Sequence, residues 1–379
     1  MQRLQTTVTF SSSAEEISHS SDEASGGGSA NTDDKTNTRI KTHTKSSSDG
    51  QPLVSVVKSH RRNGSLRQRF ESAEQLVQKF VTEAEAVAEH AVIKLCSDAW
   101  HVCHFNALPK WLQDNDFLHK GHRPPLPSFR QCFKSVFRLH TETGNIWTHG
   151  LGAALFVLLF AYSMVTFDYR ERSFVDGLML GIYFCGAITC LSFSTIFHTC
   201  SCHSREVSKF CSKLDYCGIS IQIIGSMIPA LYYGFYDNQI MYLTYITVGV
   251  VLCIISIVIS MWDKFSEPKF RPLRVGVFLV FGLSNVVPGI HWAIVLESHL
   301  IGSFLLFILQ GMLYVIGAAL YAIRIPERFF PGKCDYWFQS HQIFHILVVT
   351  AAIVHLNGIN GMAALRLSET QLQPVVEVQ

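Results

Sequence analysis

Two histidines near the C-terminus, His341 and His345, have residue type and spacing that suggest chemistry. They lie four positions apart, so on a helix both imidazoles project from one face. They also stand at the head of an apolar run that extends to Ile359. Two imidazoles in that position either bind a metal or form hydrogen bonds to neighbouring helices, and the pair alone leaves both alternatives open.

The elements that position this pair belong to a chain with an uneven distribution of polar residues. Of its 379 residues, 48% are hydrophobic and 16% are charged, against about 25% charged in an average soluble domain. The charges concentrate in the first part of the chain, whereas long apolar runs fill residues 144–360. The net charge of +2 gives no strongly basic field, so nucleic acid is not an expected partner.

Seven apolar segments, each close to the ~20 residues that cross a bilayer core, fill the second part of the chain. The pair Gly177 and Gly181 would permit close contact of the second segment with a neighbouring helix, and Pro288-Gly289 is expected to break the fifth. We predict an all-α membrane protein whose seven transmembrane helices cover residues 145–167, 174–199, 214–235, 240–262, 273–296, 300–322 and 340–359.

Lys and Arg residues in the short connections orient these helices. Thirteen of them flank the helices on one side and three on the other. This asymmetry places the N-terminus in the cytoplasm and the C-terminus outside, which is opposite to G-protein-coupled receptors. Most of the eleven cysteines then lie in apolar or cytoplasmic segments, so we expect free thiols. Cys200-Ser201-Cys202-His203 lacks the second half that a metal knuckle needs.

The topology brings further polar residues to the depth of the histidine pair. Ser194 and His198 fall at the cytoplasmic end of the second helix, and Asp215 falls at the cytoplasmic start of the third. Polar side chains at this depth are costly unless paired, and they mark function by default. With His341 and His345 they make a set of three imidazoles, one carboxylate and one hydroxyl.

This set suits zinc, because three neutral imidazoles are a common catalytic ligand set that leaves one position for water. We predict that His198, His341 and His345 bind Zn²⁺. Asp215 is either a fourth ligand or a general base that orients the water and later delivers its proton to a leaving amine. Ser194 is placed to hydrogen-bond to the water or to a substrate carbonyl. We interpret four other polar residues of the apolar segments as packing, cavity or helix-bonding residues: His149, Ser192, His291 and His355.

Four regions follow from these assignments. Residues 1–70 are too polar to bury a core and are predicted to be a disordered cytoplasmic tail. Residues 71–143 are predicted to form cytoplasmic amphipathic and interfacial helices, the first with helical apolar spacing from Leu76 and packed on the membrane domain, the last at 128–140 in the interface. Residues 144–360 form the seven-helix zinc-binding domain, and 361–379 a short extracellular tail.

Several stretches of the sequence carry a family resemblance. Residues 141–149 (TETGNIWTH), 192–198 (SFSTIFH) and 213–216 (KLDY) resemble motifs of the progestin and adipoQ receptor family. Residues 324–333 (RIPERFFPGK) are similar to the adiponectin receptors within that family. The similarity covers about 105–358.

The resemblance implies a seven-helix receptor with an inward N-terminus, in the plasma membrane. It implies zinc held by His198, His341 and His345, with Asp215 and Ser194 around the bound water. It further implies cleavage of the ceramide amide to sphingosine and fatty acid, and signalling toward lipid and glucose metabolism. The partners expected from it are an adiponectin-like extracellular protein hormone, ceramide or a related lipid, membrane lipid and a cytoplasmic adaptor at the N-terminal region.

Two functional hypotheses remain at this stage. The first is a zinc amidohydrolase that acts on a lipid at the inner leaflet and is coupled to receptor output. The second is a hormone receptor whose zinc is purely structural and whose output passes through the cytoplasmic N-terminal region. A channel or transporter fits less well, because the other helices show no further chain of ionisable residues.

Overall fold

A computed structural model of the chain describes residues 74–83, 87, 101–166, 173–263, 270–295 and 298–372. The predicted disordered tail at 1–70 lies outside the described residues. Residues 74–83 are helical, as the apolar spacing predicted, and the side chains of Leu76 and Phe80 are exposed. The packing of this helix on the membrane domain stays a prediction.

Seven helical spans in the described part of the chain are long and apolar enough to cross a membrane, which confirms the predicted fold class. Those same residues contain no strand beyond one isolated bridge, Cys103 to His122. The spans are α3 (Thr143–Val165), α4 (Phe174–Cys200), α5 (Arg205–Gly234), α6 (Gln239–Met261), the pair α7 (Arg271–Leu283) and α8 (Val286–Val295), α9 (Ile301–Ile323) and α10 (Ser340–Leu372).

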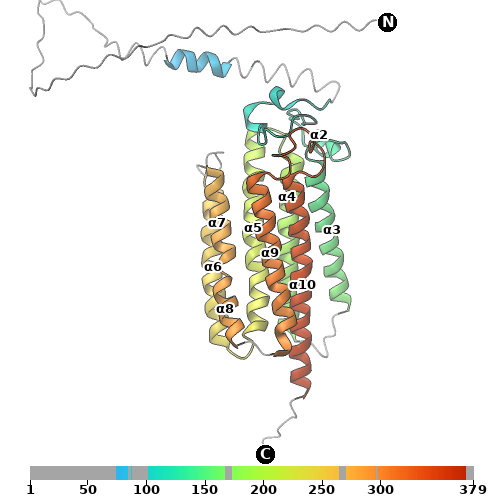
Figure 1. Ribbon diagram of the computed structural model, residues 1–379, viewed down its shortest axis with the longest axis vertical. Coiled ribbons are helices and arrows are strands. Elements are labelled where there is room, and N and C mark those ends of the chain that lie inside the picture. The colour runs from blue at the N-terminus through green and yellow to red at the C-terminus, as the bar shows by residue number, and fades with distance from the viewer. Residues whose placement is uncertain are drawn as a thin grey trace, which may run out of the picture. The chain divides into compact units, whose positions relative to one another are not determined.

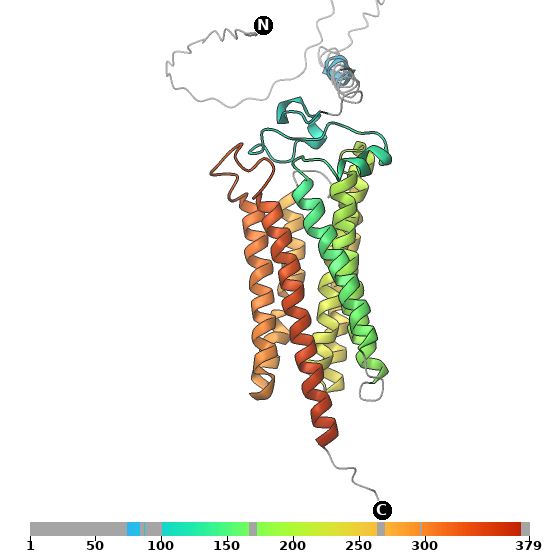
Figure 2. The same ribbon diagram turned by 90° about the vertical axis from the view of Figure 1, so that its right-hand side faces the viewer.

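Helices that follow one another in the chain pack side by side, as α3 on α4, α4 on α5, α5 on α6, and α9 on α10. In addition α10 contacts α3 and α5, so the C-terminal helix packs among the early ones (Figures 1 and 2). At the start of α4, Ser173 and Asp176 form a capping box. Asp176 also accepts a 2.7 Å hydrogen bond from Tyr233 at the end of α5, which ties the two antiparallel helices together.

Glycines set the closest approach of α4 and α5, although not at Gly181, one of the pair that the sequence suggested. Nothing lies within 4 Å of the position that a Cβ atom at Gly181 would occupy, so the predicted close contact is not formed there. At Gly225 such an atom would lie 3.1 Å from Cα of Gly186 and 3.2 Å from the carbonyl oxygen of Ile182. The two backbones therefore meet where neither helix carries a side chain.

The fifth span is broken four residues before the predicted Pro288-Gly289 position. The hydroxyl of Ser284 donates to the carbonyl oxygen of Phe281 (2.7 Å), and the amide of Asn285 donates to that of Gly282 (3.1 Å), so α7 ends there. Pro288 lies in the first turn of α8 instead, where its missing N–H costs no helical hydrogen bond.

The last helix is longer than predicted, because α10 continues to Leu372 where an extracellular tail was expected from residue 361. Arg366, only 8% exposed, pairs with Asp237 at 3.3 Å, and its guanidinium lies over the ring of Tyr236. Both partners lie in the segment that connects α5 to α6. These contacts pack the C-terminal part of α10 against the α5–α6 connection. The hydropathy of the sequence does not predict such a tertiary contact.

Residues 101–142 and 324–339, which we call the end cap, cover the end of the bundle where α3 and α10 begin (Figures 1 and 2). The prolines at 124, 125 and 127 exclude a continuous helix there. Of the predicted interfacial helix at 128–140, the segment that forms is α2 (Phe129–Ser135). Phe129 and Phe133 are exposed on one face of α2, and Cys132 is buried on the other.

Candidate metal centre

Three imidazoles meet beneath the end cap. The ring centroid of His198, on α4, lies 4.8 Å from that of His341 and 5.0 Å from that of His345, and the two α10 rings are 4.6 Å apart. One ring nitrogen from each residue lies within 4.8 Å of the other two. His198 and His345 are buried, and His341 is half-buried. The triangle has nearly equal sides, as three ligands of one ion would.

Glu142 and Arg123 hold His198 from two sides. Nδ1 of His198 lies 2.7 Å from Oε2 of Glu142, which also accepts a 2.8 Å hydrogen bond from the side-chain amide of Asn145. The buried guanidinium of Arg123 donates to the carbonyl oxygens of His198 and Thr199, at the end of α4. Burial acts to raise the pKa of Glu142, but the hydrogen bonds from His198 and Asn145 and the charge of Arg123 hold that pKa well below its usual range.

Glu327 fixes the start of α10, the helix that presents the other two imidazoles. Its carboxylate is fully buried and accepts a 2.7 Å hydrogen bond from the backbone N–H of Ser340. It also accepts from the Ser340 hydroxyl and, at 3.1 Å, from the side-chain amide of Asn115. A carboxylate that receives a first-turn N–H both satisfies an otherwise unpaired donor and complements the helix dipole. His341 follows directly.

The first two turns of α3 position His345. Nδ1 of His345 lies 3.2 Å from Oγ1 of Thr148 and 3.3 Å from the backbone carbonyl oxygen of Asn145. The ring of His149 stacks on that of His345, with centroids 3.5 Å apart and planes 10° from parallel. Because Nδ1 is occupied by α3, Nε2 of His345 is the nitrogen left for the cluster.

Asp215 and Ser194 lie beside the histidines. Ser194 is buried on α4 one turn before His198, and its hydroxyl is hydrogen-bonded to the carboxylate of Asp215 on α5. The charge of Asp215 also interacts with His198. All five residues that the sequence singled out are therefore neighbours, but the group whose nitrogens converge consists of the three histidines without Asp215.

The histidine cluster fits a divalent transition metal. Nε2 of His198 is buried and has no hydrogen-bond partner among the described residues. A buried polar atom without a partner is costly, and a cation between the three rings would satisfy it. Neutral imidazole nitrogens suit zinc as well as copper, iron and nickel, so the donor set supports a metal site without choosing the metal.

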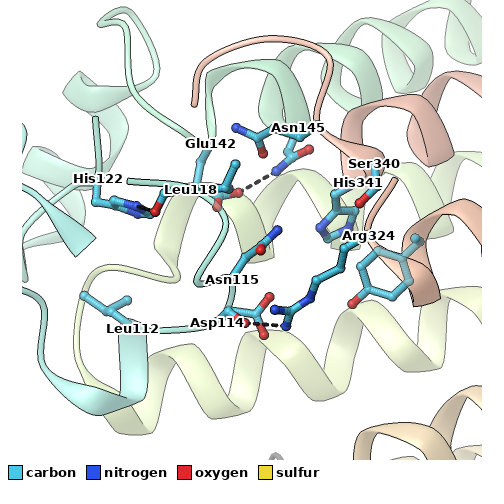
Figure 3. A pocket seen from close by; sticks show the side chains of 12 residues that line it. Leu112, Asp114, Asn115, Leu118, His122, Glu142, Asn145, Arg324, Ser340 and His341 are labelled. Atoms are coloured by element: carbon cyan, nitrogen blue, oxygen red, sulfur yellow. Dashed lines mark hydrogen bonds between the residues drawn. The ribbon is translucent and has the colours of Figure 1, made fainter. Parts of the chain in front are cut away.

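A pocket reaches the cluster through the end cap. Figure 3 shows His341, Asp114 and Arg324 around it, with Glu142 at another edge. Arg324 donates to the carboxylate of Asp116 (2.8 Å) and to the backbone carbonyl oxygen of Asp114 (2.6 Å), so its guanidinium is fixed at the rim. Because polar groups make up much of the lining, the pocket gives water a route to the edge of the histidine cluster.

The residues that hold the ligands were missed in the sequence. Glu142, Asn145 and Thr148 lie in the TETGNIWTH stretch, which carries the family resemblance and was assigned no role at the site. An acid placed one residue before an apolar helix, at the same end as the histidines, was the available signal. His149 was predicted to be a packing residue, and it does pack, but its partner is His345.

His291 and His355 pack between helices, as predicted. His291 is bonded to Tyr245 at 2.9 Å, and Nδ1 of His355 lies 3.2 Å from Oε1 of Gln310, so both connect helices. The ten cysteines in the described part of the chain are all free, as expected. Cys202 lies beside Cys132, with 3.8 Å between the sulfur atoms, and outside the histidine group.

The fold and the cluster together define a multi-pass membrane protein with seven helical spans and a three-histidine group that could hold a metal ion. Residues 137–356 match the haemolysin-III-related family. The chain belongs to this family, whose relatives include proteins named adiponectin receptor and progestin and adipoQ receptor, so the predicted membership is confirmed.

Three relatives illustrate the range of the similarity. The chain is 54% identical over 293 residues to the adiponectin receptor protein of Drosophila melanogaster, and the aligned residues make up 76% of this chain and 66% of that protein. It is 52% identical over 281 residues to the progestin and adipoQ receptor-like protein 1 of Caenorhabditis elegans (73% and 64%). Heptahelical transmembrane protein 3 of Arabidopsis thaliana is 31% identical over 291 residues (66% and 84%). The match thus spans a little less than two thirds of the first two relatives' length.

Proposed function

We propose that this protein is a receptor of the adiponectin-receptor type whose histidine cluster holds Zn²⁺ and hydrolyses the amide bond of ceramide or a related lipid. The observation that supports it best is the Asp215–Ser194 pair beside three converging imidazoles. A base, a hydroxyl and three metal ligands side by side at one end of an apolar bundle are the parts that a lipid amidase needs. The names of the relatives support the receptor part of the proposal.

His198, His341 and His345 would hold the ion through one ring nitrogen each, which leaves a coordination position open. Bound there, zinc would polarise a carbonyl oxygen and lower the pKa of a water molecule toward ~7. The pocket at His341 admits water from the end cap, and the lipid would reach the same place from the bilayer.

Asp215 would carry the proton in the reaction. Amide hydrolysis adds water across the C–N bond, and it yields a carboxylic acid and an amine. The carboxylate of Asp215 takes a proton from the attacking water and delivers it to the departing nitrogen as the C–N bond breaks. Ser194 holds that carboxylate in place through its hydroxyl.

The test is ceramide turnover by the purified, zinc-loaded protein, measured as sphingosine and fatty acid released together. Asp215→Asn keeps the size of the side chain and removes the base, so we expect turnover to fall about 10²–10⁴-fold with zinc content unchanged. Asp263→Asn, an exposed carboxylate paired with Lys213 and Lys209, is the matched control and should turn over normally. Equal rates in wild type and Asp215→Asn would refute the base assignment, and no turnover by the zinc-loaded wild type would refute catalysis.

Metal content tests the site itself. The wild type should hold one zinc ion per chain, and His341→Ala and His345→Ala should each lose it. A wild-type protein purified without chelators that contains no stoichiometric zinc, and takes up none on addition, would refute the zinc proposal.

A receptor with purely structural zinc is the second candidate. The observation in its favour is that the cluster joins α4 to α10, two helices far apart in the chain, so an ion there would cross-link the bundle. This candidate expects His198→Ala to lower thermal stability and surface expression while Asp215→Ala leaves signalling intact. The amidase proposal expects Asp215→Ala to abolish the lipid product and the output that depends on it.

The receptor names of the relatives support a location in the plasma membrane, and the Lys and Arg asymmetry supports an N-terminus in the cytoplasm. An adiponectin-like protein hormone would then bind outside, and a cytoplasmic adaptor would bind the N-terminal region. Epitope tags at the two ends test this orientation. The C-terminal tag should be stained in intact cells, and the N-terminal tag only after permeabilisation, while the reverse pattern would contradict the proposal.

A further inference from the structure

We infer that Glu142 is a positioning residue of the metal centre: its carboxylate fixes the tautomer and the ring orientation of His198 and thereby sets the affinity for the metal. The inference rests on the metal site of the proposed function. It adds to that site a residue from the end cap, one position before α3 begins.

The hydrogen bond between the two side chains carries the inference. His198 Nδ1 and Glu142 Oε2 are 2.7 Å apart, and a carboxylate can only accept, so the proton lies on Nδ1. Nε2 then carries the lone pair, and this is the buried atom without a partner among the described residues. A ligating histidine whose other ring nitrogen donates to a carboxylate is held in the metal-binding tautomer before the ion arrives.

Glu142 acts through His198 rather than as a fourth ligand. The two ring nitrogens point away from each other, one on either side of Cε1. With a Zn–N distance of ~2.1 Å, an ion at Nε2 would lie roughly 6 Å from the carboxylate oxygen that holds Nδ1. The same oxygen is already bonded to the Asn145 amide, which orients the carboxylate toward the ring.

Contacts from the start of α3 orient groups on both of the helices that carry the histidines. Asn145 orients Glu142 through its side chain and faces Nδ1 of His345 through its backbone carbonyl oxygen. A Cβ atom at Gly144 would lie within 3 Å of the side chain of Gln342, so Gly144 leaves room for that side chain where α3 meets α10. The segment from Glu142 to Asn145 thus orients one imidazole on α4 and another on α10, two helices that are far apart in the sequence.

Metal titration of the purified full-length chain tests the inference with no substrate present. Zn²⁺ affinity is measured by competition with a chromophoric chelator, and Co²⁺ is used as a probe because its visible absorption reports ligand geometry. Removing an outer partner of a ligating histidine typically costs 10–100-fold in metal affinity, so we expect that loss for Glu142→Ala together with a changed Co²⁺ spectrum. Glu142→Gln keeps an acceptor oxygen and should lose less than Glu142→Ala.

Two further variants separate positioning from folding. Glu206→Ala removes an exposed glutamate from the first turn of α5 and should bind both metals as the wild type does. Asn145→Ala keeps Glu142 but removes its orienting amide, and it should weaken binding several-fold even if Glu142→Ala does not fold. Wild-type Zn²⁺ affinity and Co²⁺ spectrum in folded Glu142→Gln and Asn145→Ala, or in Glu142→Ala, would overturn the inference. A wild type that binds neither metal would instead refute the proposed metal site.

Discussion

Removing the Glu327 carboxylate should loosen the start of α10 and, with it, two of the three imidazoles. Glu327 lies in the loop between α9 and α10, is 0% exposed and accepts hydrogen bonds from the backbone N–H and the hydroxyl of Ser340. His341 is the next residue and His345 follows one turn later. Glu327→Ala therefore removes the group that fixes the helix end from which both ligands project.

The magnitude follows from the donors left behind. The Ser340 N–H is buried and loses its acceptor, which costs about 1–3 kcal/mol, and the lost charge at the helix N-terminus adds about 0.3–1 kcal/mol. The Ser340 hydroxyl can rotate toward another acceptor, and the Asn115 amide is half-buried and can reach water, so neither adds much. The expected total is about 1–4 kcal/mol. Glu327→Gln retains one acceptor oxygen and should cost roughly half as much.

Thermal unfolding in detergent, followed by a thiol-reactive dye that labels buried cysteines as they become exposed, measures this loss. About 1–4 kcal/mol corresponds to a fall in Tm of about 1–8 °C for a chain of more than 250 residues, and metal affinity should fall as well. Glu83→Ala is the control, because that carboxylate is exposed and its ion pair with Lys79 is 3.9 Å long. If Glu327→Ala unfolds with the Tm of the Glu83→Ala control, the assigned role of Glu327 is wrong.

Three other perturbations have expected outcomes. Gly225→Ala should lower the free energy of unfolding by about 1–3 kcal/mol, because the new methyl group meets the backbone of α4 at Gly186. Gly181→Ala places its methyl group in open space and should change that free energy by no more than about 0.5 kcal/mol. Thermal unfolding of the two variants measures the difference. Burial, aided by the charge of Arg123, lowers the pKa of His140 to about 3. As the pH falls, the unfolded chain therefore binds a proton at His140 below about pH 6.5, whereas the folded chain binds it only near pH 3. The free energy of unfolding should then decrease by up to ~1.4 kcal/mol for each unit that the pH falls across this window. His140→Gln should reduce this dependence on pH in denaturant titrations at several pH values. Removal of zinc by a chelator should lower the Tm, and zinc added back at 100 times its Kd should raise the free energy of unfolding by about 2.7 kcal/mol. The Tm of His341→Ala should respond to neither treatment. An equal response in that variant would mean that the stabilising ion binds elsewhere.

The fold was predictable from the sequence wherever a single helix carries its own signal. Hydropathy and length identify all seven spans because each must supply enough apolar side chains to cross a bilayer. The features that failed depend on partners in other elements. The length of α10 depends on the pairing of Arg366 with Asp237, and the close α4–α5 crossing depends on which glycines face each other, as Gly225 and Gly186 do. Residue spacing within one helix contains neither fact.

The candidate site shows the same division. The three histidines were found because imidazoles in apolar segments are rare and because topology put them at one depth. Glu142 could not be ranked from the sequence, since many acids precede apolar helices and only the fold shows that this one meets Nδ1 of His198. Arg123 lies in a proline-rich stretch that the sequence indicates is a connection, although its guanidinium donates to backbone carbonyl oxygens at the end of α4.

The end cap is therefore part of the candidate metal centre rather than a cover for it. The end cap pairs the terminal backbone groups of both helices that carry the histidines. Arg123 donates to carbonyl oxygens at the end of α4, and Glu327 accepts from the first N–H of α10. Gln339, just before α10, also donates to the backbone oxygen of Thr141 at 3.0 Å, which links the two segments of the cap. A change that moves one segment of the cap relative to the other is expected to move His198 relative to the α10 histidines, because each helix end is bonded to a different segment. A partner that moves one cap segment is therefore expected to alter the geometry of the cluster without touching a histidine, and by linkage a metal that prefers one geometry would stabilise the cap arrangement that produces it.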